Sequence, residues 1–220
     1  MPPRKLPRRP RLLSASNPAS QLFEPGLVPG FLLFSPTIAM ALKSTIFRAN
    51  LTVSDLDRGH FAEHILTLAR HPSETDERMM VRVLAFALNA DERLQFGRGI
   101  STVDEPALWV RDDTGREIQW IEVGLPDERL LRRACGRADE VIVFAYGGRV
   151  VDIWWQKDAA TLGKLGNLKV FSLAPEDSRA LAALAERNMN LSCTIQDGQI
   201  WFSSGDTTLT LSLRTVYPQT

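Results

Sequence analysis

The chain has 220 residues, of which 44% are hydrophobic and 24% charged, and this is enough to bury one sizeable core. The 26 basic and 26 acidic residues cancel, so the composition argues against a strongly basic nucleic-acid-binding domain. Proline, glycine or charge interrupts every apolar stretch before it reaches the length of a membrane span, which argues against a membrane protein.

Residues 1–39 differ in composition from the rest of the chain. They hold eight of the 13 prolines, and five basic residues against one acidic residue, Glu24. A secretory signal, suggested by the short apolar run 31–34, and a basic arm for nucleic acid are two interpretations of this segment. Because Pro29 and Pro36 flank that run, we expect instead a disordered extension, followed by a single folded domain over residues 40–220.

The first expected elements of this domain are a strand and two helices. Residues 43–53 alternate loosely between apolar and polar side chains and predict a strand, whereas residues 57–69 have the spacing of an amphipathic helix. A second helix is expected over 74–89, with Ser73 as its N-cap and an apolar stripe of Met80, Val83, Leu84, Ala87 and Leu88. Glu77 continues that stripe, so we expect its carboxylate to point inward, and a buried carboxylate needs a reason.

Two acidic residues, Asp104 and Glu122, flank a predicted β-hairpin. Its strands lie over residues 106–110 and 119–122, on either side of a turn at Asp113. If the hairpin folds about Asp113, the numbers of paired residues sum to 226 and Asp104 lies opposite Glu122. The Cβ atoms of opposed residues are about 5 Å apart, so like charges repel there. Such a pair is usually neutralised by a proton, a base or a metal ion.

The rest of the chain predicts further helices and strands. The expected helices cover residues 127–138 and 175–188. The expected strands cover 141–146, 150–155 and 169–173, and a β-meander follows over 191–213 with turns at Asp197-Gly198 and Gly205-Asp206. This order predicts an α/β fold with a mixed central β-sheet flanked by helices and a C-terminal β-meander.

A basic stripe is expected near the acidic pair. The helix over 127–138 follows Glu122 directly and presents Arg129, Arg132, Arg133 and Arg137 on one side. Acids that hold a divalent cation beside arginines that bind phosphate oxygens are the layout of a metal-dependent phosphodiesterase. The structural alternatives are that Asp104 starts a strand, Glu122 forms an ion pair, Glu77 is a helix-start acid, and the arginines form a solvated face.

Other motifs carry less weight. His60-Phe-Ala-Glu63-His64 matches the HxxEH zinc pattern on an expected helix, with two exposed histidines as the alternative. The tryptophans could stack bases, but their expected strands favour the core, and the neighbours Trp154 and Trp155 would face opposite sides. The two cysteines form no CxxC motif, which argues against a zinc finger or a disulfide framework and favours a reducing, cytoplasmic setting. No P-loop, GxGxxG or GxSxG motif is present, which argues against nucleotide hydrolases, Rossmann enzymes and covalent hydrolases.

Several long segments carry a resemblance to a known family. They are HPSETDERMM (71–80), ADERLQF (90–96), DEPALW (104–109), WIEVGLPDER (120–129), WWQ (154–156) and TIQDGQIW (194–201). Together they resemble the bacterial YaeQ family, over residues 40 to the C-terminus. That family is regarded as a variation of the PD-(D/E)XK nuclease fold, so the resemblance implies a mixed sheet flanked by helices.

The resemblance also implies a site. In such nucleases an acid on the first core helix, an aspartate on one strand and an acid-x-lysine on the next strand act together, and these positions correspond to Glu77, Asp104 and Glu122. The backbone carbonyl of Val123 would be a further metal ligand. Gly124 occupies the lysine position, which departs from the pattern. Arginine does not deprotonate, so Arg132 or Arg133 could stabilise charge there but could not act as the general base.

Two hypotheses follow for the function. The first is phosphodiester hydrolysis on nucleic acid with Mg²⁺ or Mn²⁺, in which Asp104, Glu122 and the Val123 carbonyl hold the metal. Glu77 would then be an outer-sphere ligand, and Arg132 and Arg133 would bind phosphate. The second is a catalytically inactive nuclease-fold protein that binds a protein or nucleic acid. The sequence leaves open the oligomeric state and the choice between DNA and RNA.

Overall fold

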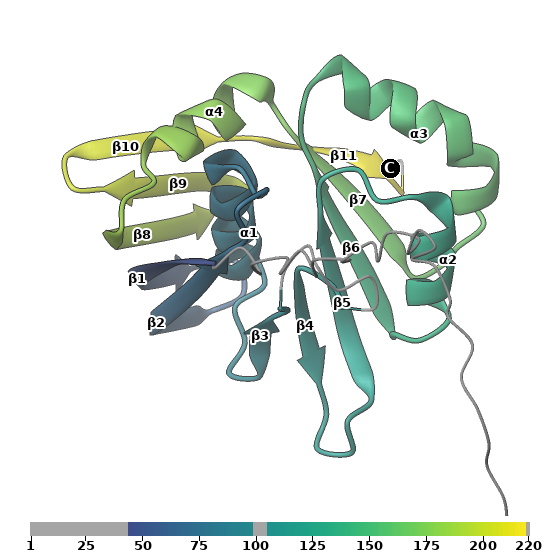
Figure 1. The fold of residues 1–220 in the computed structure, drawn as a ribbon, viewed down its shortest axis with the longest axis horizontal. Helices are drawn as coiled ribbons and strands as arrows, with labels where there is room; N and C mark the ends of the chain where they lie inside the picture. The colour runs from purple at the N-terminus through teal and green to yellow at the C-terminus, as the bar shows by residue number, and fades with distance from the viewer. Residues whose placement is uncertain (1–43, 99–104, 219–220) are drawn as a thin grey trace, which may run out of the picture. The chain divides into compact units, whose positions relative to one another are not determined.

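The strands of the protein form two sheets in the computed structural model, which describes residues 44–98 and 105–218 (Figure 1). In the described part, the first sheet has five strands in the order β10-β9-β8-β1-β2. The bounds of these strands are Thr45–Asp55 for β1, His60–Arg70 for β2, Asn188–Gln196 for β8, Gln199–Ser204 for β9 and Thr207–Leu211 for β10.

The prediction of a helix over residues 57–69 is wrong, because most of this segment is strand β2. It pairs along its whole length with β1 in an antiparallel hairpin. Its buried side chains, Leu66 and Leu68, are two residues apart, while Phe61 and Ile65 face solvent. The apolar residues fit the spacing of a helix as well as that of a strand, and the long-range pairing with β1 decides in favour of the strand.

The second sheet contains the parallel strands on which the site analysis rests. Its order is β11-β7-β6-β5-β4-β3, and β5, β6 and β7 run parallel to one another. Their carboxyl ends therefore meet at one edge, which is where open α/β sheets bind ligands. The bounds are Leu94–Phe96 for β3, Leu108–Arg111 for β4, Glu117–Val123 for β5, Glu140–Ala145 for β6, Leu168–Leu173 for β7 and Leu213–Tyr217 for β11.

The predicted hairpin exists as β4 and β5, but its predicted register is wrong. Trp109 pairs with Trp120 and Leu108 pairs with Ile121, so the paired numbers sum to 229 instead of 226. A register irregularity between Val110 and Arg111 accompanies the turn. Arg111 pairs with Glu117, and these numbers sum to 228, so the turn is centred near Thr114 and not at Asp113. The irregularity adds one further residue to β5 and moves every pair beyond it by one.

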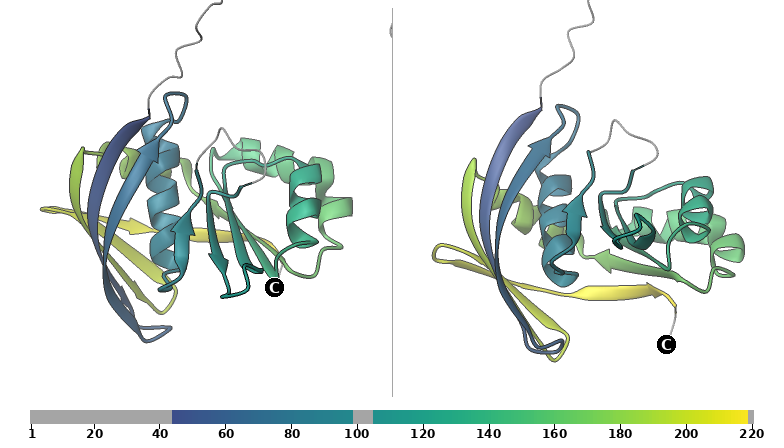
Figure 2. Two further views of the ribbon diagram at one scale, coloured as in Figure 1. Left: turned by 60° about the horizontal axis from the view of Figure 1, so that its bottom comes forward. Right: turned by 90° about the horizontal axis from the view of Figure 1, so that it is seen from below.

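Four helices pack on the described sheets. Helix α1 (Asp76–Leu88) lies between the two sheets and contacts α4 (Pro175–Ala183), whereas α2 (Glu128–Cys135) and α3 (Arg149–Leu162) cover the other face of the second sheet (Figure 2). Residues 79–87 of α1 are all buried, as expected of a helix enclosed on several sides. Accordingly, one hydrophobic cluster joins α1 to both sheets, and a second joins α2 and α3 to the second sheet.

Two further boundaries differ from the expectations. Residues 150–155, predicted as a strand, lie in helix α3, where Trp154 and Trp155 have ring centroids 6.1 Å apart and so do not face opposite sides. Thr75, and not Ser73, caps α1, since its hydroxyl accepts a hydrogen bond from the Arg78 amide. The segment after Ala183 turns into strand β8, so α4 ends earlier than its apolar pattern suggested.

The predicted α/β class, with a mixed sheet flanked by helices and C-terminal strands, is confirmed. The meander is formed by β8, β9 and β10, with Asp197 and Gly198 at positive φ in the first turn. The last strand, β11, leaves the meander and pairs with β7 in the second sheet. No helix within residues 44–98 and 105–218 is long and apolar enough to cross a membrane.

Candidate functional site

Glu122 lies at the carboxyl end of β5 and is the most unusual carboxylate of the described part. It is only 7% exposed, and burial raises its pKa from 4.5 to about 7. The Trp120 indole Nε1–H donates a hydrogen bond of 2.9 Å to Oε1, and this bond, the Arg78 charge and the Ala107 backbone lower the pKa in part. A carboxyl group that titrates near neutral pH at a sheet edge is a candidate acid, base or metal ligand.

Trp120 and Glu122 point to the same face of the second sheet. They are two residues apart on β5, and Trp120 packs in the cluster formed with α2 and α3. Ile121 and Val123 point the opposite way, towards α1. The Glu122 carboxylate therefore belongs to the α2 and α3 side of the sheet, although it lies close enough to the sheet's end to interact with Arg78 of α1.

A buried ion network begins α1 beside this edge. The Glu74 carboxylate accepts hydrogen bonds from Arg78 Nη1 at 2.7 Å and from Arg82 Nη2 at 2.8 Å. Glu74 is 3% exposed and Arg82 is 1% exposed, so both charges are almost removed from water. Glu74, Arg78 and Arg82 are four residues apart in turn, which places them on one face of the helix and its entry.

Arg78 connects this network to the ends of two parallel strands. Its positive charge lowers the pKa of Glu122, at the end of β5. It also opposes the rise in the pKa of Tyr146, just after β6, that burial causes. The Glu77 carboxylate acts on Tyr146 in the opposite direction and raises its pKa. The start of α1 and the ends of β5 and β6 thus share one electrostatic environment.

Glu77 points inward, as its place on the helical stripe predicted, but it points towards α4. Its Oε1 accepts a hydrogen bond of 2.6 Å from the Ser178 hydroxyl, and Ser178 is completely buried. Glu122 lies on the opposite face of the second sheet from α1. The structure therefore gives Glu77 a helix-bridging role, and its predicted role as an outer-sphere metal ligand stays a prediction.

Asp104, the partner expected for Glu122, lies outside the described residues. The observed pairs end at Leu108 with Ile121, and continuing their register by one residue places Ala107 opposite Glu122. A hydrogen bond from the Ala107 backbone lowers the Glu122 pKa. Within the described ranges, no group of three histidine, cysteine or acidic side chains is placed to hold a metal ion. Any metal site at this edge therefore needs a ligand such as Asp104 in addition to Glu122 and the Val123 carbonyl.

Gly124, at the position of the expected lysine, has a φ of +105°. An L side chain rarely adopts this conformation, although a Cβ added there would meet no atom within 4 Å. A lysine at this position would therefore strain the local backbone, although space is available for its side chain.

The predicted arginine stripe is only partly realised. Arg132 is exposed on α2 and donates to Glu128 Oε1 at 3.3 Å, while the neighbouring Leu131 packs towards the sheet. Arg137 binds Glu117 at 2.6 Å, at the opposite end of β5 from Glu122. Arg133 is also exposed on α2. A role for Arg132 and Arg133 as phosphate clamps would require substrate to reach the outer side of this helix.

A model of the YaeQ protein family matches residues 40–213 of this chain. The chain belongs to the YaeQ family. The YaeQ proteins of Salmonella typhi and Escherichia coli (strain K12) are each 49% identical to it over 174 residues, which are 79% of this chain and 96% of the relative. These findings confirm the family membership that the sequence motifs predicted.

Solved structures of the YaeQ family share the fold. The crystal structure of the YaeQ protein from Xanthomonas axonopodis pv. citri has a TM-score of 0.76 at 49% identity and covers 79% of this chain and 98% of that chain. The YaeQ protein from Pseudomonas syringae also has a TM-score of 0.76, at 35% identity, with 80% and 97% covered.

The HxxEH pattern lies on strand β2 and not on a helix. His60 and His64 share one face, with ring centroids 6.0 Å apart, and His64 packs edge-on against Phe86. Glu63 is an odd number of residues from both and therefore points to the other face. The strand geometry separates the three side chains that the zinc motif needs together, so the pattern is structural here.

Sequence reasoning missed the ion network and Tyr146. Glu74 was treated only as the first residue of an expected helix, and no role was assigned to Arg78 or Arg82. The regular spacing of Glu74, Arg78 and Arg82 was a usable signal, because it predicts adjacent charges on one helix face. No comparable signal marks Tyr146 or Ser178, whose partners are remote in the sequence.

Proposed function

We propose that this YaeQ family member has a nuclease-related site and hydrolyses phosphodiester bonds of nucleic acid with Mg²⁺ or Mn²⁺. The observation that carries the proposal is the buried Glu122 carboxyl group, with a pKa of about 7, at the edge where three parallel strands end. The carboxyl ends of parallel strands are the usual ligand-binding edge of such a sheet, and a carboxyl group with a raised pKa at this edge is typical of a functional site.

The chemistry of the available ligands fits a hard divalent cation. Glu122 and Asp104 offer carboxylate oxygens and Val123 offers a backbone carbonyl, which are the oxygen ligands that Mg²⁺ and Mn²⁺ prefer. A bound cation supplies an activated water and offsets charge on the phosphate. Ionised Glu122 is unfavourable in its buried site, so a nearby positive charge would stabilise it strongly.

The other residues of the site have supporting roles in this proposal. Trp120 orients the Glu122 carboxylate through its indole N–H. Arg78 adds a positive charge at the same edge, which favours approach of a phosphate backbone. Arg132 and Arg133 lie on the neighbouring helix and would contact phosphates further along the nucleic acid. Because Gly124 provides no lysine, activation of water would depend on the metal and on Glu122.

The test is cleavage of labelled single- and double-stranded DNA and RNA by the full chain with Mg²⁺ or Mn²⁺. We expect metal-dependent cleavage that falls by at least about 100-fold in Glu122→Gln and in Asp104→Asn. Glu186→Gln, at an exposed glutamate before β8, is the matched control and should retain activity. No cleavage of any of these substrates by the native chain would reject the enzymatic proposal.

A second candidate function is a catalytically inactive nuclease-fold protein that binds nucleic acid or a protein. Gly124 at the lysine position and the hydrogen bond of Glu77 to Ser178 favour it, because both remove expected parts of a catalytic site. Thermal unfolding with Mn²⁺ separates the cases. Stabilisation that Glu122→Gln abolishes, without cleavage, supports a retained but inactive metal site, and no effect of metal at all supports a binding role alone.

A further inference from the structure

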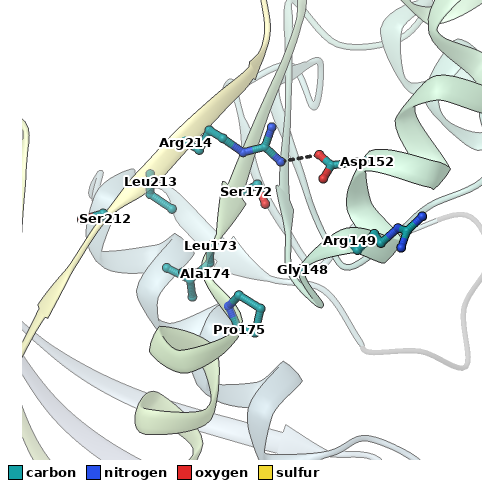
Figure 3. A pocket seen from close by; sticks show the side chains of 10 residues that line it. All are labelled: Gly148, Arg149, Asp152, Ser172, Leu173, Ala174, Pro175, Ser212, Leu213 and Arg214. Atoms are coloured by element: carbon teal, nitrogen blue, oxygen red, sulfur yellow. Dashed lines mark hydrogen bonds and ion pairs between the residues drawn. The ribbon is translucent and has the colours of Figure 1, made fainter.

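A second groove lies at the same edge of the second sheet, beyond β6 and β7. Its volume is about 610 Å³, and it is bordered by the starts of α3 and α4 and by β11 (Figure 3). The volume lies in the range of small-molecule sites, roughly 300 to 1,000 Å³. None of the acids or arginines assigned to the proposed nuclease site lines it.

The start of α3 borders this groove through Gly148, Arg149 and Asp152. Gly148 is the N-cap and supplies no side chain to accept a hydrogen bond from the first turn. The Val151 amide donates to the Gly148 carbonyl at 2.9 Å, so the first amides of the 14-residue helix and the positive end of its dipole are what the groove offers to an anion. A Cβ on Gly148 would lie 2.7 Å from Pro175 Cγ, so glycine allows the starts of α3 and α4 to meet here.

The side chain of Ser172 gives independent evidence for a ligand in this groove. It is only 6% exposed, yet it lines the groove from β7, between its neighbours Ala145 on β6 and Arg214 on β11. Within residues 44–98 and 105–218, its hydroxyl has no hydrogen-bond partner. Figure 3 shows the side chain of Ser172 between Arg214 and Gly148. Although the residue is nearly buried, its hydroxyl oxygen is open to the groove, where a ligand can replace water as its hydrogen-bond partner.

Two arginines supply positive charge at the groove. Arg214 binds Asp152 with Nη2 at 2.6 Å from Oδ1, and both side chains are about half exposed. Arg149 lies in the first turn of α3, and its exposed side chain points away from Ser172 in Figure 3. No ion pair of Arg149 occurs in the described part of the chain, so its guanidinium is free to turn towards an anion.

We propose that this groove binds the phosphate group of a small phosphate monoester. The terminal oxygens of a phosphate can accept at once from the α3 amides, the Ser172 hydroxyl and an arginine, which matches the donors present. The organic part of the ester would lie on the apolar wall formed by Leu173, Pro175 and Leu213. Asp152 competes with the phosphate for Arg214, so it weakens the binding.

Isothermal titration calorimetry of the full chain with adenosine 5′-monophosphate in EDTA tests the proposal. Without metal the assay does not depend on hydrolysis, so failure of the nuclease proposal would leave its result unaffected. We expect binding that Ser172→Ala weakens about tenfold, as for a lost hydrogen bond to a charged group. Arg149→Ala should also weaken it, and Asp152→Asn should strengthen it several-fold because Arg214 is released.

Arg179→Ala is the control, since Arg179 is an exposed arginine of α4 that does not line the groove, and it should change the affinity less than twofold. Each variant is first compared with the native chain in thermal unfolding. Adenosine without phosphate should not bind, and equal binding of adenosine would overturn the proposal. Equal affinity for inorganic phosphate would overturn the role of the apolar wall. Unchanged affinity in both Ser172→Ala and Asp152→Asn would overturn the assignment of the groove.

Discussion

Two buried glutamates near the same edge of the second sheet are compensated in different ways. Glu74, at the entry to α1, accepts from two arginines at 2.7 and 2.8 Å. Glu122, at the end of β5, accepts from a neutral indole, and its pKa rises to about 7. A carboxylate with matched charges serves the fold, whereas one left without a direct cationic partner can exchange a proton or bind a cation near neutral pH.

The largest effect is expected when the structural carboxylate of Glu74 is removed. Glu74→Ala leaves the Arg82 guanidinium buried beside Arg78 without its counter-charge, so we expect a loss of about 3 to 5 kcal/mol in the free energy of unfolding. Urea denaturation measures it. Glu74→Leu combined with Arg82→Met should recover much of the loss, because no unpaired charge stays buried. A double variant as unstable as the single one would mean that lost packing, not lost charge balance, dominates.

The second test uses the pH dependence of stability at Glu122. The folded chain keeps a proton on Glu122 up to about pH 7, whereas an unfolded glutamate releases it near 4.5. The folded state therefore binds more protons in this interval, and its stability decreases as pH rises from about 4.5 to 7. The difference between the two pKa values corresponds to about 3 kcal/mol of lost stability above pH 7.

Glu122→Gln should remove this contribution. As pH rises from 5 to 8, we expect the free energy of unfolding of the variant to increase relative to that of the native chain by up to about 3 kcal/mol. Urea denaturation at both pH values measures this difference. Glu92→Gln, at an exposed glutamate, should follow the native profile. A Glu122→Gln profile parallel to the native one would show that Glu122 is ionised in the folded protein already at pH 5.

A smaller effect is expected from the indole that holds Glu122. Trp120→Phe removes the N–H donor and some buried volume, so the free energy of unfolding should fall by about 2 kcal/mol. The Glu122 pKa should rise above about 7, since this hydrogen bond favours the ionised form. Carboxyl NMR titration measures the pKa, with Trp201→Phe on β9 as control. An unchanged pKa of Glu122 in this variant would show that the Trp120 indole does not influence the carboxyl group.

The smallest effect is expected at the bridge between α1 and α4. Ser178→Ala removes the hydroxyl that donates to Glu77, and we expect a loss of about 1 kcal/mol in the free energy of unfolding. Thermal and urea unfolding measure it, and Ser203→Ala on β9 serves as control. If cleavage activity is found and falls far more than stability in Ser178→Ala, Glu77 belongs to the catalytic site as well as to the fold.

Local patterns predicted much of the fold. The strand over 43–53, the helix that starts after Asp127 and the meander with its Asp197-Gly198 turn were all recognisable, because caps, turns and alternation act within a few residues. Two segments were predicted with the wrong secondary structure, 57–69 as a helix and 150–155 as a strand. Their apolar residues fit the spacing of both a helix and a strand. Pairing with β1 and packing on the second sheet decided their conformations.

The candidate site was predictable only in part. Its acidic residues stood out in the sequence. However, a turn centred one residue later than predicted and a register irregularity together place Ala107, and not Asp104, opposite Glu122, and Ser178 on a remote helix binds Glu77. Neither partner could be deduced from spacing along the chain, because both depend on how elements distant in sequence pack.

The sequence by itself determined the α/β class and the carboxylates worth examining, since these follow from residue types and short-range periodicity. It also determined the family, through the resemblance of its long segments to known YaeQ proteins. Only the tertiary structure decided that Glu74 is paired while Glu122 titrates near pH 7, and that Ser172 faces a groove without a partner. Burial and the positions of opposite charges set these properties, and both arise when the second sheet brings β5, β6 and β7 together beside α1 and α3.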